Sequence, residues 1–307
     1  MPSPSTSAAG REAWPELPYD AWKDTYATLH MWTQMVGKVA LACGPALNHC
    51  WGSALLCTAR GLRTRPLWLE ERAFTVSFDF LDHRLLIETS DGERRALDLE
   101  PRPVADFYRE LTAALDAMRL PVHIWPVPVE LASPIPFEED TGHRSYDRVH
   151  VERWWQIVSQ VHRVFTARRC AFIGKCSPVH FFWGAFDLAV TRFSGRPAPP
   201  RDGPAFQREA YSHEVISHGF WPGSAPVLEP AFYAYAVPEP PGLATATVLP
   251  EGGYYHAELR EFILPYEAVR TSASPDAAIA AFVDSTYDRA ATLAGWNRQA
   301  LERARPA

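Results

Sequence analysis

Two segments that lie far apart in the chain repeat the same residues in the same order. WTQMVGKV, from Trp32, aligns without a gap with WWQIVSQV, from Trp154, and shares Trp, Gln and both Val residues. A second pair follows, in which the run beginning at Trp51 shares Trp, Gly, Leu and Arg with the run beginning at Trp183. Two matches in one order are typical of an internal repeat, so we predict a tandem duplication.

The hydrophobic pattern predicts a similar order of elements in each half. Apolar residues at helical spacing predict helices, and apolar runs between turn residues predict strands. The expected helices cover 21–43, 103–118, 151–172 and 275–294. The expected strands cover 50–61, 73–80, 84–89, 95–99, 122–131, 181–193, 210–217, 231–236 and 254–264. This order predicts an α+β fold of two tandem helix–antiparallel sheet–helix units packed together.

The predicted units span residues 14–132 and 148–300, and the second unit carries the candidate site. An acidic, proline-rich linker at 133–147 separates them. Residues 1–13 lack an apolar segment, so we expect a disordered tail and not a signal peptide.

Composition and charge exclude several classes of protein. The net charge of −6, without a face-long Lys/Arg cluster, argues against nucleic-acid binding. No apolar run reaches the roughly 18 residues that a membrane span needs. The five cysteines are odd in number and form no CxxC pair, which is typical of a protein of the reducing cytoplasm.

Histidines and a carboxylate in the second half suggest a metal site. Residues two apart on a strand share a face, so His256 and Glu258 are expected to point the same way. If their strands are neighbours, His213 joins them, and His180 lies at the end of the adjoining strand. His213, His256 and Glu258 are therefore candidate ligands of a divalent transition metal. A metal-free pocket and a solvated sheet face are the alternatives.

The segment SHEVISH does not match a zinc-protease motif. Its two histidines, His213 and His218, are one residue too far apart for HExxH, and on a strand they face opposite ways. His180, His213 and Glu214 stay candidate catalytic residues for another kind of site.

Cys176 is a candidate nucleophile. It follows Lys175 and precedes His180 by four residues, and cationic neighbours of this kind lower the pKa of a thiol. Buried cysteines are commonly inert, however, and no known nucleophile motif surrounds this one. Lys175 is equally suited to present its ammonium group to an anionic ligand, and it is a candidate catalytic residue with Cys176.

The expected strand 181–193 places its polar residues on defined faces. Trp183 and Asp187 share one face, and His180 lies on the other if the strand is regular. Asp187 is expected to pair with Arg192 or Arg196. Six residues are candidates for contacting a ligand: Trp183, Arg192, Tyr211, Tyr233, Tyr235 and Tyr255.

In the first half, His30, Gln34 and Lys38 share one face of the expected helix 21–43. Such a stripe can line a cleft, but we favour a solvent-exposed face for it.

The strings FIGKCSPVHFFWG, SHEV, GFWPG, YYHAEL and LPYEAVR, with the opening WPELPYDAWKDTYATLH, carry a family resemblance. They resemble a family of uncharacterised bacterial proteins that share a conserved domain of unknown function. The resemblance covers residues 14–296, and it implies neither an activity, nor a cofactor, nor a catalytic residue.

The sequence therefore leaves three functions open. The first is an enzyme of unknown reaction that acts on a small molecule in a His/Glu/Tyr-lined pocket, with or without a metal. The second is a non-catalytic small-molecule-binding or interaction protein, because the tryptophans and tyrosines are suited to stacking on a ligand. The third is an enzyme that uses the Cys176 thiol as its nucleophile.

Overall fold

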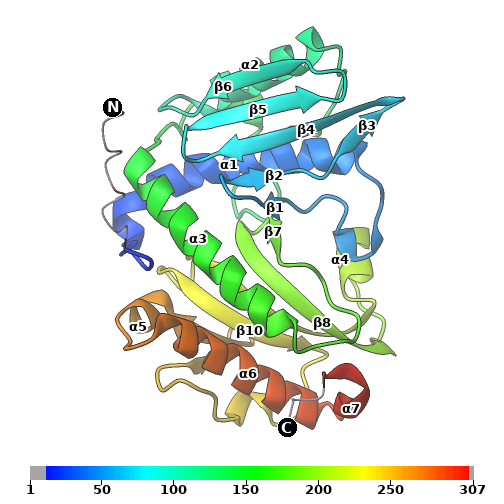
Figure 1. Cartoon of the computed structure of the whole chain (residues 1–307), viewed down its shortest axis with the longest axis vertical. Coiled ribbons are helices and arrows are strands. Elements are labelled where there is room, and N and C mark those ends of the chain that lie inside the picture. The colour runs from blue at the N-terminus through cyan, green and yellow to red at the C-terminus, as the bar shows by residue number, and fades with distance from the viewer. Residues whose placement is uncertain (1–11, 304–307) are drawn as a thin grey trace, which may run out of the picture.

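The computed structural model describes residues 12–303, which form two antiparallel sheets with helices packed against them (Figure 1). The helices are α1 (Tyr19–Cys43), α2 (Val104–Ala117), α3 (Arg148–Arg169), α4 (Ala205–Ala210), α5 (Tyr266–Arg270), α6 (Pro275–Leu293) and α7 (Arg298–Leu301). Three 3-10 helices are η1 (Asn48–Cys50), η2 (Phe137–Glu139) and η3 (Leu243–Thr245). Separate antiparallel sheets with helices confirm the predicted α+β class. The predicted tail falls mainly on residues 1–11, outside the described residues.

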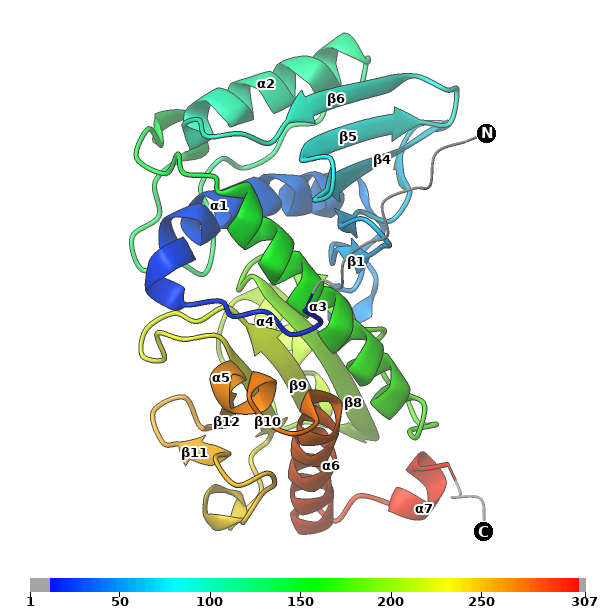
Figure 2. The same ribbon diagram turned by 60° about the vertical axis from the view of Figure 1, so that its left-hand side comes forward.

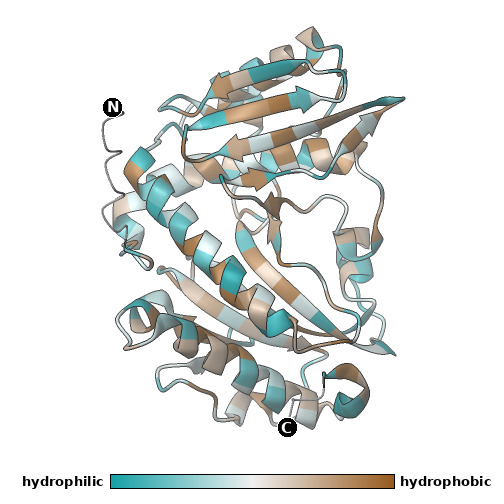
Figure 3. Cartoon of the chain, viewed as in Figure 1, coloured by the Kyte–Doolittle hydropathy of each residue, from teal (hydrophilic) through white to brown (hydrophobic). Residues whose placement is uncertain are grey.

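The first sheet follows the meander that the sequence predicts. Its strands are β1 (Leu56–Cys57), β2 (Leu62–Arg63), β3 (Leu67–Leu69), β4 (Arg72–Asp79), β5 (Arg84–Thr89) and β6 (Arg94–Asp98). They lie in the order β1-β2-β4-β5-β6, and β3 also pairs with β4. Phe74, Val76 and Phe78 alternate with more exposed residues along β4 and are buried, as expected for a sheet with one covered face (Figure 3).

The second sheet lies in the C-terminal half and holds the residues of chemical interest. Its strands are β7 (His180–Phe182), β8 (Asp187–Pro197), β9 (His213–Trp221), β10 (Ala231–Val237), β11 (Tyr254–His256) and β12 (Glu261–Pro265). They lie in the order β11-β12-β10-β9-β8-β7. Helices α3 and α6 cover one face of this sheet (Figure 2). We call the opposite face the open face.

Contacts across the covered face show how the helices are fixed. Phe165 of α3 meets Phe232 of β10 with 6.3 Å between ring centroids. Thr286 of α6 lies 3.0 Å from the imidazole of His218 on β9. Helix α3 begins where the carboxylate of Asp147 accepts hydrogen bonds from two backbone N–H groups of the first turn. The covered face is therefore occupied by packing, which leaves the open face for a site.

Helix α1 joins the two halves. The indole of Trp183, from the second half, lies directly on Gly37, where a Cβ atom would be only 2.1 Å from the ring. Its Nε1–H donates to the carbonyl of Ser53 at 3.0 Å. His30 Nε2 donates to the carbonyl of Gly184 at 2.8 Å, and Gln34 exchanges two hydrogen bonds with the backbone of Val129.

The stripe of His30, Gln34 and Lys38 is buried, so the interpretation of a solvent-exposed face was wrong. His30 and Gln34 are tolerated in the interior because they form hydrogen bonds with the backbone of Gly184 and Val129, outside the helix. Helix α1 is enclosed by both halves, and this enclosure cannot be read from its own periodicity.

One hydrophobic core runs through both halves and contains Trp32 of α1 and Trp154 of α3. The predicted linker contributes Phe137 to the same core. Trp51 and Trp183 lie in turns and not on strands, so their expected strand positions are wrong. Both sheets are largely sequential meanders, and the duplication stays a prediction. No helix within residues 12–303 is long and apolar enough to span a membrane.

Candidate functional site

A tight turn decides which side chains share the open face. The expected strand 181–193 is a hairpin: β7 ends at Phe182, residues 183–186 form a turn, and β8 begins at Asp187. Phe182 pairs with Asp187, and His180 pairs with Ala189. Directly paired residues lie on the same face of a sheet, so His180 and Asp187 are on one face. The expectation that they point to opposite faces was wrong because it assumed an unbroken strand.

Asp187 is a buried carboxyl without a cationic partner among the described residues. Its side chain is 6% exposed, and its Oδ2 accepts a hydrogen bond from the Tyr233 hydroxyl. Burial raises the pKa of Asp187 to about 7, although the bond from Tyr233 opposes the shift. The expected ion pairs do not form. Arg192 lies on the covered face against the Tyr287 ring, and Arg196 pairs with Glu214.

Tyr233, which contacts this carboxyl, is the first of three neighbouring tyrosines. The ring of Tyr233 lies over Gly219 of the neighbouring strand, where a Cβ atom would be 2.1 Å from Tyr233 Cζ. Glycine at this position is what lets the Tyr233 hydroxyl reach across β9 to Asp187. The rings of Tyr233 and Tyr235 stack with centroids 5.9 Å apart. The Tyr235 hydroxyl lies 3.0 Å from that of Tyr211.

A second carboxyl, Glu261, completes the arrangement. On the register of β10 with β12, it stands opposite Tyr235, because Ala234 pairs with Phe262. Burial, followed by the charge of Asp187, raises the pKa of Glu261 to about 7. Asp187, Tyr211, Tyr233, Tyr235 and Glu261 are hereafter the carboxyl–tyrosine cluster.

The cluster offers proton donors and acceptors in an apolar surrounding. Ala189, Ile263 and Val227 form a small hydrophobic group with Tyr233 on the open face, and Trp221 packs against it. Low polarity keeps a carboxyl from ionising easily, so Asp187 and Glu261 change protonation state near neutral pH. Such groups suit general acid–base chemistry, and the tyrosine hydroxyls suit hydrogen bonding to a polar ligand.

The predicted metal ligands do not come together. His213 begins β9, His256 ends β11, and Glu258 is exposed in the turn that follows. The expected strand 254–264 is interrupted by this turn, so Glu258 does not share a strand face with His256. Within residues 12–303 there is no group of three or more His, Cys, Asp or Glu side chains that could hold a metal ion.

The other candidate catalytic residues lie outside the cluster. The Lys175 ammonium contacts His49 Nε2 at 2.6 Å. Burial raises the pKa of the Cys176 thiol, against the smaller opposite effect of Arg192, which disfavours a nucleophilic thiolate. His180 is fully buried on the open face and accepts a hydrogen bond from Arg65.

Three of the six predicted ligand-contacting residues, Tyr211, Tyr233 and Tyr235, belong to the cluster. Trp183 is buried in the turn against α1. Tyr255 packs on Phe262 and donates its hydroxyl proton to Glu239 at 2.9 Å.

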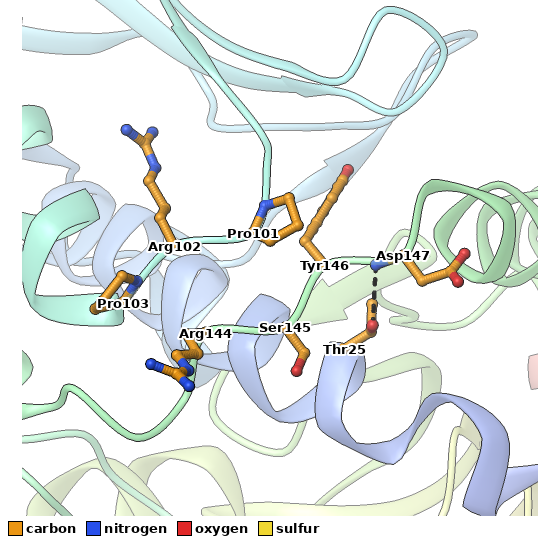
Figure 4. A pocket seen from close by; sticks show the side chains of 8 residues that line it. All are labelled: Thr25, Pro101, Arg102, Pro103, Arg144, Ser145, Tyr146 and Asp147. Atoms are coloured by element: carbon orange, nitrogen blue, oxygen red, sulfur yellow. Dashed lines mark hydrogen bonds between the residues drawn. The ribbon is translucent and has the colours of Figure 1, made fainter.

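Two surface hollows lie away from the cluster. One, of about 550 Å³, lies between α1 and the segments that lead into α2 and α3 (Figure 4). It is lined by Thr25, Pro101, Arg102, Pro103, Arg144, Ser145, Tyr146 and Asp147. Thr25 accepts from the Asp147 N–H at 3.0 Å, and Tyr146 bonds to His83, so these polar groups hold segments together. The other, of about 360 Å³, includes Glu214 and the loop after β10.

The sequence did not identify Glu261, His49 or Arg65 as site residues. Glu261 lies in an apolar strand beside Tyr235, and only the register of two strands brings them together. His49 and Arg65 come from the first half of the chain, whereas the site was expected in the second half. The only sequence feature that pointed to Glu261 is its position as a lone carboxylate in the apolar run 261–265.

The model of a family of unknown function, DUF5996, matches residues 14–303. No curated protein and no solved structure is significantly similar to the chain.

Proposed function

The chain belongs to the DUF5996 family of unknown function, and from its geometry we propose that it is an enzyme for general acid–base chemistry on a small polar molecule. The observation that carries the proposal is the Asp187 carboxyl, which is buried on the open face and has a pKa raised to about 7 by burial. A group that titrates near the working pH is present in both forms and can take or give a proton.

The cluster gives each residue a separate role in this proposal. Asp187 transfers the proton, and Tyr233 orients it and stabilises its ionised form through the hydroxyl hydrogen bond. The paired hydroxyls of Tyr211 and Tyr235 bind polar atoms of the substrate. Glu261 is a second proton-transferring group. The five cysteines are free thiols, which supports the cytoplasmic location predicted for this enzyme.

A panel of chromogenic probes tests the proposal. It contains p-nitrophenyl esters, phosphates and glycosides, together with 5-nitrobenzisoxazole, whose ring opens when a base removes its C–H proton. We expect the wild-type protein to turn over at least one probe. Replacement Asp187→Asn should lower that rate by about 10²–10⁴, because a positioned general acid or base contributes this much. With 5-nitrobenzisoxazole, the rate should rise as the pH increases through about 7, because the base that removes its C–H proton is the ionised Asp187 carboxylate.

The matched control is Asp98→Asn, because Asp98 is an exposed carboxylate of the first sheet that pairs with Arg84. It should retain the wild-type rate. Equal rates for Asp187→Asn and Asp98→Asn would remove Asp187 from the chemistry. Ligands that bind to the open face without any turnover would instead favour a non-catalytic binding protein.

A further inference from the structure

A group of nitrogen donors lies on the edge of the second sheet, apart from the carboxyl–tyrosine cluster. Lys175, in the loop before β7, and His49, in η1, are brought together where η1 packs against α4 (Figure 1). Trp51 follows η1, and Arg65 follows β2. With His180 of β7, these five residues are hereafter the donor cluster. They come from both halves of the chain.

The protonation of His49 follows from its contacts. Its Nδ1 lies 3.2 Å and 3.1 Å from the carbonyl oxygens of Glu209 and Ala210, so Nδ1 carries the hydrogen. Its Nε2 is then a lone-pair acceptor, and the Lys175 ammonium donates to it at 2.6 Å. An ammonium group has three N–H donors, so two remain for another partner.

Aromatic rings hold the ammonium group in place. The Lys175 nitrogen lies 4.9 Å from the centroid of the Phe193 ring and 5.7 Å from that of Trp51. Such cation–π contacts favour the charged form without supplying a negative charge. The Lys175 side chain is exposed, so a ligand can reach it from solvent.

Arg65 adds a second cation beside Trp51. Its Nε donates to the Trp51 carbonyl at 3.4 Å, and its Nη2 donates to His180 Nε2 at 3.0 Å. His180 must therefore carry its hydrogen on Nδ1, because a neutral imidazole has one donor and one acceptor. His180 is 0% exposed, and its Nδ1–H has no hydrogen-bond partner among the described residues. Buried donors are nearly always satisfied, so this N–H needs an acceptor from outside the protein chain, such as a water molecule or a ligand.

The positive charge of the donor cluster is not neutralised by the chain. Within residues 12–303, neither Lys175 nor Arg65 forms an ion pair with a carboxylate, whereas Arg196, elsewhere on this sheet, pairs with Glu214. Both cations contact Trp51, and the His180 imidazole that accepts from Arg65 has an unpaired N–H on its other nitrogen. The donor cluster therefore has several N–H donors and no anionic acceptor among the described residues. Phosphate and carboxylate oxygens are the acceptors that such charged donors bind most strongly.

We propose that the donor cluster binds the phosphate or carboxylate group of a small anionic molecule, with Lys175 and Arg65 as its charged contacts. This inference stands on the donor set and does not depend on an acid–base role for Asp187.

Protein labelled with ¹⁵N only in histidine tests the site, since the His49 ring reports on Lys175. Separate titrations with inorganic phosphate and acetate, at constant ionic strength set with chloride, distinguish the two anion chemistries. We expect a saturable shift of the His49 ring signal with at least one anion. Lys175→Met should weaken the apparent affinity by about tenfold or more, as expected for loss of a charge-assisted hydrogen bond.

Lys23→Met is the matched control, because Lys23 is an exposed lysine of α1 that pairs with Asp20. It should bind like the wild type, and Arg65→Met should weaken binding as Lys175→Met does. The proposal is overturned if neither anion gives a saturable shift, or if Lys175→Met binds as tightly as Lys23→Met. If the protein binds neither anion but still turns over a chromogenic probe, the anion-binding proposal fails and the acid–base proposal stands.

Discussion

Replacement Asp187→Asn is expected to change how the stability of the protein depends on pH. The pKa of Asp187 is raised from 3.8 to about 7 in the folded protein. Between these two pKa values the folded chain holds a proton that the unfolded chain has lost. The free energy of unfolding of the wild type therefore falls as pH increases through this window, and the loss is complete above the folded pKa.

The side-chain amide that Asp187→Asn introduces cannot ionise, so the variant lacks this loss. Relative to the wild type, it should gain on the order of 3 kcal/mol of stability between about pH 5 and pH 8, since one pKa unit is worth about 1.4 kcal/mol. Urea unfolding at the two pH values measures the difference, and any constant effect of the amide cancels. Asp98→Asn is again the control. Parallel pH dependences for Asp187→Asn and the wild type would show that Asp187 ionises normally.

Replacement Trp183→Ala is expected to cause the largest loss of stability, about 4 kcal/mol, because truncating a buried tryptophan to alanine typically costs about 3–5 kcal/mol. The indole is 9% exposed, fills the space above Gly37 and donates to the Ser53 carbonyl. Its loss therefore opens a cavity between the halves and leaves the half-buried Ser53 carbonyl without this partner. Urea unfolding at one pH measures this change.

Trp68→Ala is the matched control, because this tryptophan of the first sheet is 55% exposed. It should cost less than about 1 kcal/mol, as exposed substitutions usually do. A similar small loss for Trp183→Ala would mean that the turn 183–186 does not join the halves in the way described.

The local pattern of the sequence predicted much of the fold. Helix α2 was expected at 103–118 and spans Val104–Ala117, because a regular apolar stripe marks its inner face. The hairpin of β7 and β8 was missed because its turn, Trp-Gly-Ala-Phe, is apolar and mostly buried and resembles a strand. That single error reversed the face assigned to His180 relative to Asp187.

The candidate site was only partly predictable. Tyr211, Tyr233 and Tyr235 were identified from their density in apolar strands. Sequence proximity suggested Arg192 or Arg196 as the partner of Asp187. Residues five apart on one strand face opposite sides of a sheet, however, and Arg192 lies on the covered face of β8. Contacts such as Tyr233 with Asp187, or Lys175 with His49, depend on strand register and on packing between the halves. A single sequence does not contain this information in its local pattern.

Direct titration of the Asp187 carboxyl is the measurement that tests the central claim most closely. Protein labelled with ¹³C at the aspartate side-chain carboxyl gives one signal for each residue, and Asp187→Asn identifies the signal of Asp187 by its loss. Followed from about pH 4 to about pH 9, this signal should titrate with a midpoint near 7, since the pKa is raised to about 7 by burial. A midpoint near the ordinary aspartate value of about 4 would contradict the account. The carboxyl would then be fully ionised at neutral pH and unsuited to act as the acid that the proposed chemistry requires.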